Sequence, residues 1–239
     1  MSTSDTSGVT AQEGEGSTLE GLLAGRALSY RMFSRLFLKP LSEADIEELD
    51  AMDLVARSQE LGGESLLAAG FNDMGRGLRK RNTATRQKLA TDFTMCFDGV
   101  ETFDEKVAVP YASIFLGEKA LFNQEPRNEV YRLFKSEGIS LKGGVNLPED
   151  HLSFELEFLA VLSDRATAAL EAGDTEEAHR ILDLSADFIN GHILTWIGLL
   201  ADRAAQILRT RFYRGLLAAT QGYLELDLET IADVKEELG

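Results

Sequence analysis

The chain has 239 residues, 44% of them hydrophobic, which is enough for one large core or two small ones. Its 40 acidic and 24 basic residues give a formal net charge of -16, which disfavours nucleic acid and anionic membranes as partners and favours basic proteins. Composition excludes collagen-like and disordered classes. We expect no stable membrane insertion, because the longest apolar run, Ile193 to Ala201, is far shorter than the ~20 residues of a membrane span.

The composition predicts an all-α fold. Only four prolines interrupt a chain rich in Ala, Leu, Glu and Arg, and runs of β-branched residues are few. We expect a helical bundle of about ten helices in two halves, joined by a glycine-containing hinge. The expected organisation is a disordered tail at 1–17, an N-terminal half at 18–138, a hinge at 139–147 and a C-terminal half at 148–239.

The N-terminal half is predicted to contain one long helix and several shorter ones. An apolar stripe at helical spacing follows Thr18 and stops at Pro40. Ser42 and Asp45 have the spacing of a cap for a second, short helix. The other helices predicted in this half are 64–81, 84–97, a short segment at 110–116, and 126–138.

The C-terminal half should begin after the hinge glycines Gly143 and Gly144. A helix is expected to start near Pro148 and to run to Gly173, because proline in a first turn loses no hydrogen bond and acidic residues there suit the helix dipole. Asp174 then caps a helix that Gly191 ends. Further helices are predicted at 193–209, 212–226 and 228–238.

Cysteine usage and the N-terminus indicate a cytoplasmic protein. Cys96 is the sole cysteine, so no internal disulfide can form, which agrees with a reducing compartment. Its neighbours Phe93, Met95 and Phe97 favour a buried structural thiol. The first residues lack the basic and apolar regions of an export signal.

No enzyme class finds its residues in the sequence. His151, His179 and His192 lack the spacing of a zinc site, and neither a nucleophile elbow nor a phosphate-binding glycine loop is present. Glu155 and Glu157 lie on different faces of a helix and cannot act as an acid/base couple. We therefore expect no catalytic residue, no metal site and no cofactor, and we predict that the chain is not an enzyme.

The segment Asn146 to Leu162 places a proline, three acids and a histidine in the start of one amphipathic helix. Two interpretations stay open on the residues alone. Asp150 can cap the helix while His151 bonds locally, which requires no ligand. Alternatively, this acid and histidine form a rigid edge that binds a partner.

Three segments, in the same order, resemble the TorD/DmsD family of cytoplasmic chaperones for molybdenum-containing oxidoreductases. Pro148-Glu149-Asp150-His151 followed by Glu155 to Phe158 is similar to the family signature. The upstream resemblance covers Asp92 to Phe97 and the Pro-Tyr-x-Ser segment in Val109 to Ile139, with a departure at Ala112, where the family often has an acid. The downstream resemblance lies in Phe188, His192 and Trp196.

This resemblance implies a function. The chain would bind the twin-arginine leader, and also the body, of a molybdopterin oxidoreductase subunit, and would hold it back from export until its cofactor is inserted. It would act as a monomer or as a homodimer that exchanges its C-terminal halves. Guanine-nucleotide binding is attributed to the family, but no motif in this sequence supports it.

The resemblance and the residue chemistry together define a candidate peptide-binding set. The carboxylates of Glu149, Asp150 and Glu155 are expected to face the leader arginines through charge-assisted hydrogen bonds. His151 would make binding sensitive to pH near its ordinary pKa of about 6.5. The apolar part would be lined by Tyr111 and Ser113, whereas Phe115 is expected in the core. The full set is Tyr111, Ser113, Pro148, Glu149, Asp150, His151 and Glu155.

A generic all-helical adaptor or regulator that binds another basic protein through its acidic surface is the alternative. It shares the expected fold, charge and lack of catalytic residues. Binding to a twin-arginine leader peptide would separate the two hypotheses.

Overall fold

The computed structural model describes residues 10–62, 64–79, 83–99, 108–117, 125–141 and 147–239. Every regular element within these ranges is helical, which confirms the all-α prediction. The α-helices in chain order are α1 (Thr10–Leu38), α2 (Glu43–Ala51), α3 (Leu54–Glu60), α4 (Leu66–Leu78), α5 (Thr83–Phe97), α6 (Ala112–Leu116), α7 (Glu125–Ser136), α8 (Leu152–Glu171), α9 (Thr175–Gly191), α10 (Ile197–Ala205) and α11 (Arg211–Leu238). A short 3-10 helix, η1 (Ile193–Thr195), separates α9 from α10.

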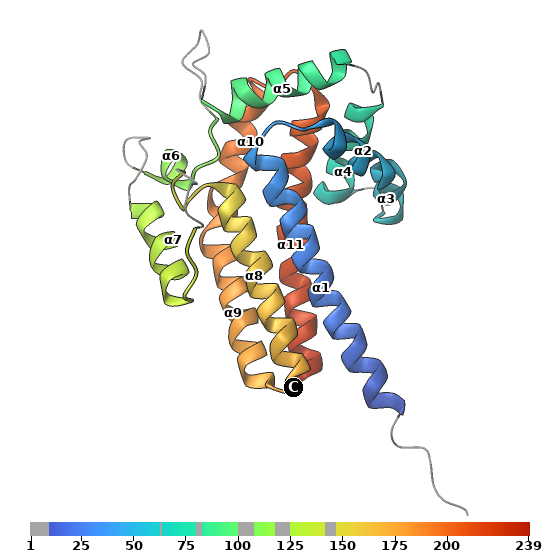
Figure 1. Ribbon diagram of the computed structural model, residues 1–239, viewed down its shortest axis with the longest axis vertical. Helices are drawn as coiled ribbons and strands as arrows, with labels where there is room; N and C mark the ends of the chain where they lie inside the picture. Colours follow the sequence, from blue (N-terminus) through green and yellow to red (C-terminus); the bar gives the residue numbers. More distant parts are fainter. Residues whose placement is uncertain (1–9, 63, 80–82, 100–107, 118–124, 142–146) are drawn as a thin grey trace, which may run out of the picture.

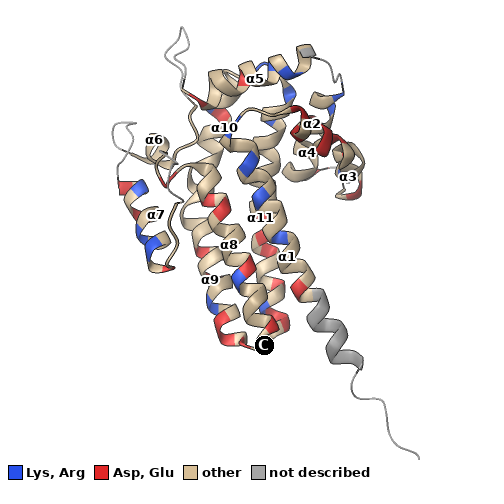
Figure 2. Ribbon diagram, in the orientation of Figure 1, with Lys and Arg blue, Asp and Glu red and all other residues tan. Residues whose placement is uncertain are grey.

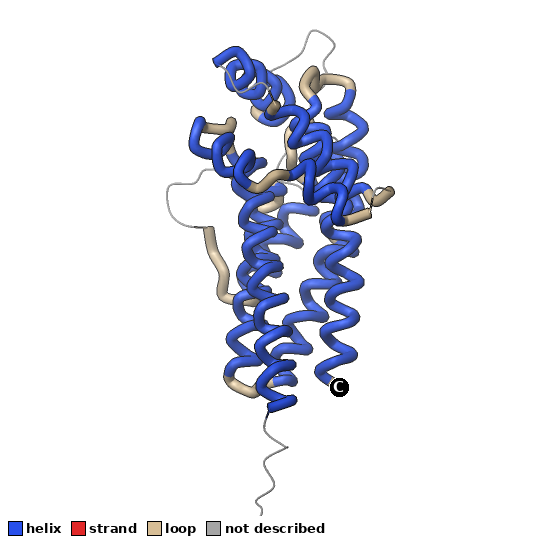
Figure 3. The backbone as a smooth tube through the Cα atoms, turned by 90° about the vertical axis from the view of Figure 1, so that its right-hand side faces the viewer, coloured by secondary structure: helices blue, strands red, loops and turns tan. Residues whose placement is uncertain are grey.

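Long helices give the molecule an elongated shape. Helices α1, α8, α9 and α11 run along the long axis of the molecule, and α8 contacts both α1 and α9 (Figure 1). Helices α2 to α5 lie around one end of α1 and α11, whereas α6 and α7 lie on the side of α8 and α9 (Figures 1 and 3). The start of α8 is thus placed beside α6.

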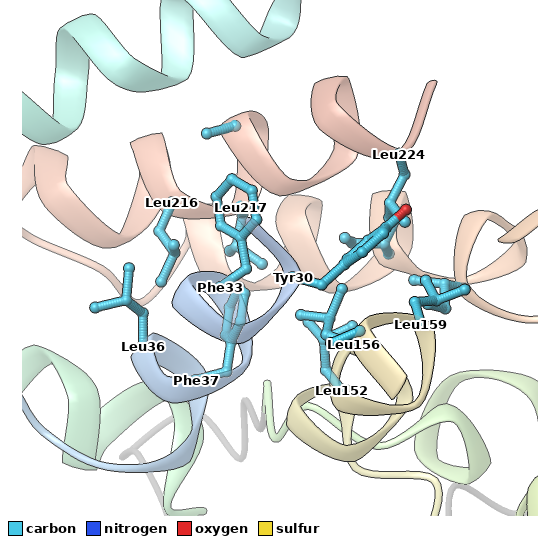
Figure 4. Packing of buried hydrophobic residues seen from close by; sticks show 14 of the residues in the cluster. Tyr30, Phe33, Leu36, Phe37, Leu152, Leu156, Leu159, Leu216, Leu217 and Leu224 are labelled. Atoms are coloured by element: carbon cyan, nitrogen blue, oxygen red, sulfur yellow. The ribbon is translucent and has the colours of Figure 1, made fainter. Parts of the chain in front are cut away.

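The core forms where α1 passes between α8 and α11. Aromatic and leucine side chains of α1 face leucines of the other two helices (Figure 4). A buried ion pair also joins α1 to α11: Arg26 Nε and Asp227 Oδ1 are 2.6 Å apart, and the Tyr30 hydroxyl donates to Asp227 Oδ2 at 2.5 Å. Removing either charge would leave the other one buried and unpaired, which is strongly destabilising.

Packing crosses the boundary between the two predicted halves. The most extensive helix contacts are those of α1 with α8 and of α4 with α11, so one hydrophobic cluster contains residues from both segments. The hinge glycines Gly143 and Gly144 lie outside the described residues. The hinge and the division into halves therefore stay predictions.

Helices α4 and α11 approach closely at three glycines. A methyl group added to Gly70 would lie 2.3 Å from the backbone nitrogen of Ala219, and one added to Gly222 would lie 2.3 Å from that of Leu67. Gly215 faces the same contact from α11, where an added methyl group would lie 2.6 Å from the carbonyl oxygen of Gly70. Glycines that weaken α4 as an isolated helix therefore permit its tertiary packing.

Several predicted boundaries are confirmed. Ser42 caps α2 in a capping box with Asp45. Asp174 caps α9, where its side chain accepts a hydrogen bond from the Glu177 amide, and α9 ends at Gly191. Cys96 is fully buried, and burial raises the pKa of its thiol to about 12.

Other predicted boundaries are wrong. Helix α8 begins at Leu152 rather than near Pro148, α3 was not predicted, and α11 is continuous where two helices were expected. The segment predicted as one helix at 193–209 is η1 followed by α10. Helix α1 starts at Thr10, inside the predicted tail; because residues 1–9 are outside the described residues, disorder there stays a prediction.

The stretch Thr175–Ala205 is long and apolar enough to cross a membrane by length and composition, a test that core helices of soluble proteins also pass. It comprises α9, η1 and α10, and α9 and α10 both pack against α11. This stretch therefore contributes to the helical core.

We predict that Gly222→Ala lowers the free energy of unfolding by about 1–3 kcal/mol, because the added methyl group meets the α4 backbone and the helices must separate. Urea denaturation followed by circular dichroism measures the change. Gly198→Ala is the matched control, since its methyl group would meet only the Gln221 side chain at 4.0 Å. The control should be neutral or slightly stabilising; equal losses in the two variants would contradict the close contact.

Candidate functional site

The start of α8 is held by Pro110 and Tyr111 together with the first two residues of α6. Tyr111 and His151 form an isolated antiparallel β-bridge. The Ala112 amide donates to the Asp150 carbonyl at 3.1 Å, and the Leu152 amide donates to the Pro110 carbonyl at 2.9 Å. We call Pro110–Ser113 together with Asp150–Leu152 the clasp.

Asp150 makes a third hydrogen bond within the clasp. Its Oδ2 atom accepts a hydrogen bond from the Ser113 amide at 2.8 Å. The Oδ1 atom is buried and has no hydrogen-bond partner among the described residues. Burial raises the pKa of Asp150, and the bonds from Ser113 offset only part of this shift.

Glu155 lies one turn further along α8 and is fully buried, with 0% of its surface exposed. Neither of its carboxyl oxygens has a hydrogen-bond partner within the described structure. Burial raises its pKa well above the ordinary value, and the nearby charge of Asp150 raises it further. The indole of Trp196 is close enough to favour the charged form slightly, but it makes no hydrogen bond to the carboxyl group.

His151, rather than Asp150, is the N-cap residue of α8. Its Nδ1 atom accepts a hydrogen bond from the Ser153 amide at 3.1 Å, which requires a neutral ring with the proton on Nε2. Burial lowers the pKa of His151 to about 4. The prediction that His151 titrates near its ordinary pKa is therefore wrong for this structure.

Glu149 and Pro148 lie at the outer edge of the clasp. Glu149 Oε2 is 2.6 Å from Arg127 Nε on α7, so this acid already has a cationic partner. Pro148 is partly buried, and its carbonyl accepts a hydrogen bond from the His151 amide at 3.2 Å. Pro148 therefore belongs to a turn before α8 and does not start the helix.

Aromatic contacts complete the clasp. The rings of Tyr111 and His151 meet edge to face at 4.8 Å between centroids. Phe115 on α6 stacks on Trp196 at 5.7 Å, and the guanidinium of Arg203 lies over Phe115 at 4.8 Å. Phe115 thus packs against the core, as expected, but is only partly buried.

The structure brings most of the predicted set together. Tyr111, Ser113, Asp150, His151 and Glu155 form one buried cluster, with Glu149 and Pro148 at its edge. Sequence analysis missed that Trp196 lies beside Glu155 and that Arg127 pairs with Glu149. No signal in one sequence could have found these contacts, because they join residues on different helices.

The cluster is chemically unusual because three buried carboxyl oxygens have no hydrogen-bond partner in the described part of the chain: Oδ1 of Asp150 and both oxygens of Glu155. Such acceptors are costly to leave unpaired. No group of three or more potential metal-binding side chains occurs in the described part of the chain. A guanidinium, which carries five donors and no acceptor, suits these oxygens.

We predict that His151 makes the fold less stable in mild acid. The unfolded state takes up a proton near pH 6.5 and the folded state only near pH 4, so stability is lost as the pH falls through this window. Between about pH 7 and pH 5 this histidine should cost about 2 kcal/mol.

Urea denaturation of wild type and His151→Gln at the two pH values measures this difference. The variant should lose less stability on acidification than wild type. His179→Gln, at a partly buried position of α9 outside the clasp, is the control and should follow wild type. The same acid response in His151→Gln as in wild type would contradict the assignment. Asp150 and Glu155 have raised pKa values, so they stabilise the fold on acidification, in the opposite direction to His151. Because both acids are present in wild type and in the variant, they do not affect the comparison.

Comparison with known proteins places the chain among relatives of known name. The family described as "Nitrate reductase delta subunit" matches residues 64–202. "Chaperone protein TorD" of Vibrio parahaemolyticus is 32% identical over 205 residues, covering 84% of this chain and 92% of the relative. The same-named protein of Vibrio cholerae is 29% identical over 214 residues, covering 89% and 94%.

These matches confirm the family resemblance read from the signature segment. The relatives are named as chaperones, which agrees with the prediction that the chain is not an enzyme. The chain belongs to the nitrate reductase delta subunit family and, within it, to the TorD chaperones.

Proposed function

We propose that this protein is a cytoplasmic chaperone that binds the twin-arginine leader of a molybdopterin oxidoreductase subunit. Binding holds the client back from export while it folds and receives its cofactor. The mechanism makes and breaks no covalent bond and needs no bound cofactor. Guanine-nucleotide binding rests on the family resemblance alone.

The observation that carries this proposal is the pair of buried acids, Asp150 and Glu155, at the start of α8. Three of their carboxyl oxygens have no hydrogen-bond partner among the residues that the structure describes, and the leader supplies consecutive guanidinium groups. Arg127 neutralises Glu149, so it leaves the inner acids as the better partners for a client. Charge-assisted hydrogen bonds in such a site contribute about 1.5–3 kcal/mol each.

Burial of the acids implies that the clasp opens when the leader binds. Asp150 and Glu155 are fully buried, and the segment Pro110–Ser113 lies against the first of them. Opening breaks two backbone hydrogen bonds and the bond from the Ser113 amide. The new bonds to the arginines would offset this loss.

Oligomeric state is part of the same proposal. The protein acts as a monomer or as a homodimer that exchanges residues 148–239. Exchange would preserve the contacts of α1 with α8 and of α4 with α11. Each contact joins a helix of the N-terminal part of the chain to a helix of the exchanged segment, so it can re-form between protomers. Light scattering over a concentration series separates these states.

The test is the affinity for a fluorescent twin-arginine leader peptide. The double variant Asp150→Asn with Glu155→Gln keeps side-chain shape but removes both charges, so its dissociation constant should rise at least about tenfold. Glu157→Gln is the control, because this acid lies on the same helix with its side chain 46% exposed. Wild-type affinity in the double variant would contradict the site, and a wild-type protein that binds no leader would contradict the function.

A further inference from the structure

Glu149, at the edge of the clasp, is an acid of the candidate site that already has a cation bound to it. It directly precedes Asp150 in the chain, but the two side chains lie in different surroundings. Asp150 is fully buried inside the clasp. The Glu149 side chain is 16% exposed and faces α7, where Arg127 Nε lies 2.6 Å from its Oε2 atom. Two neighbouring acids are therefore presented in two directions, one inward and one toward α7.

Arg127 lies in the first turn of α7, a helix that carries several basic residues (Figure 2). Helix α7 is anchored to α8 further along, where the rings of Phe134 and Phe158 pack at 4.7 Å between centroids. Arg127 lies outside this anchor, so its side chain can change partners without unpacking the helix. Its charge also acts on Asp150 and lowers the pKa of that acid. The acids of the site thus face a cation of the protein itself.

The pair of Arg127 and Glu149 has the features of an exchangeable contact. Arg26 donates two hydrogen bonds to Asp227, at 2.6 and 2.8 Å, and both side chains are buried. Arg127 donates a hydrogen bond to Glu149 through Nε alone, and its side chain is 31% exposed. Breaking a buried two-bond pair is costly, whereas a partly exposed one-bond pair contributes little. The Arg127 guanidinium also lies over the Tyr131 ring at 5.8 Å, a contact that does not depend on Glu149.

We propose that Arg127 is an internal competitor for one of the two leader arginines. In the free protein it occupies Glu149. When the leader binds, one leader arginine enters the inner acids, and its neighbour displaces Arg127 from Glu149. Consecutive side chains of an extended peptide point to opposite sides, which matches the two directions in which the acids are presented. This inference rests on the proposed leader binding and concerns the regulation of the same site.

Competition of this kind limits the affinity of the site and helps it to release the leader. The leader arginine at Glu149 gains only the difference between its own hydrogen bonds and the bond that Arg127 loses. A leader guanidinium can bind a carboxylate through two hydrogen bonds, so the exchange still favours the leader. Because Arg127 stays tethered beside Glu149, it rebinds at a high effective concentration once the leader arginine detaches. The chaperone therefore retains its client and can still hand it on for export.

The test is fluorescence anisotropy with two peptides. One is the twin-arginine leader; in the other, the arginine that contributes less to wild-type binding is replaced by glutamine, because the exchange predicts a smaller net gain for the arginine at Glu149. Arg127→Gln removes the competitor, so it should lower the dissociation constant for the twin-arginine leader about threefold to tenfold, mainly through slower release. The dissociation constant for the single-arginine peptide should stay close to that of wild type.

Arg132→Gln is the matched control, because it removes another α7 cation, one that pairs with Glu125 and is 64% exposed. It should bind both peptides as wild type does. Arg127→Lys keeps a cation beside Glu149 and should also stay close to wild type. The gain in affinity should vanish when Glu149→Gln is combined with Arg127→Gln, since the competitor acts through that acid. Circular dichroism checks that the variants fold as wild type does.

Three results would overturn the inference: unchanged or weaker binding of the twin-arginine leader by Arg127→Gln, an equal gain for the single-arginine peptide, or a gain that persists in the double variant. In each of them the wild-type protein still binds the leader, so the proposed function stands. A wild-type protein that binds no leader would contradict that function and this inference with it, so the two failures are distinguishable.

Discussion

The clasp is the constraint on which the candidate site depends. Two backbone hydrogen bonds and the bond from the Ser113 amide to Asp150 tie Pro110–Ser113, which includes the first two residues of α6, to the start of α8. Asp150, His151 and Glu155 are all buried, and burial then determines their chemistry. It raises the pKa values of the two acids and lowers that of the histidine. All three pKa shifts favour the neutral form of the side chain, because burial disfavours the charged form.

The remaining fold holds the clasp in place. Helix α8 is fixed along its length by α1, and α1 is joined to α11 by the buried pair of Arg26 and Asp227. Close packing at the glycines of α4 and α11 joins a further helix to this framework. A packed bundle therefore supports the clasp.

Sequence patterns predicted the helical class, most helix positions and most of the clustered residues. The caps at Ser42 and Asp174 were readable because capping depends on neighbouring residues. The start of α8 was misplaced because Pro148, Glu149 and Asp150 have the composition of a first helical turn. They form a turn outside the helix instead, and pairing with Tyr111 holds His151 extended. The burial of Glu155 beside Trp196 depends on contacts between distant helices, which local patterns cannot specify.

The central claim is that a client opens the clasp to reach the acids. Hydrogen exchange at the Ala112, Ser113 and Leu152 amides, with and without a saturating twin-arginine leader peptide, tests it most directly. The account predicts faster exchange at these amides when the peptide is bound, while amides in the α4–α11 contact stay unchanged. Bound peptide with unchanged or slower exchange in the clasp would contradict it.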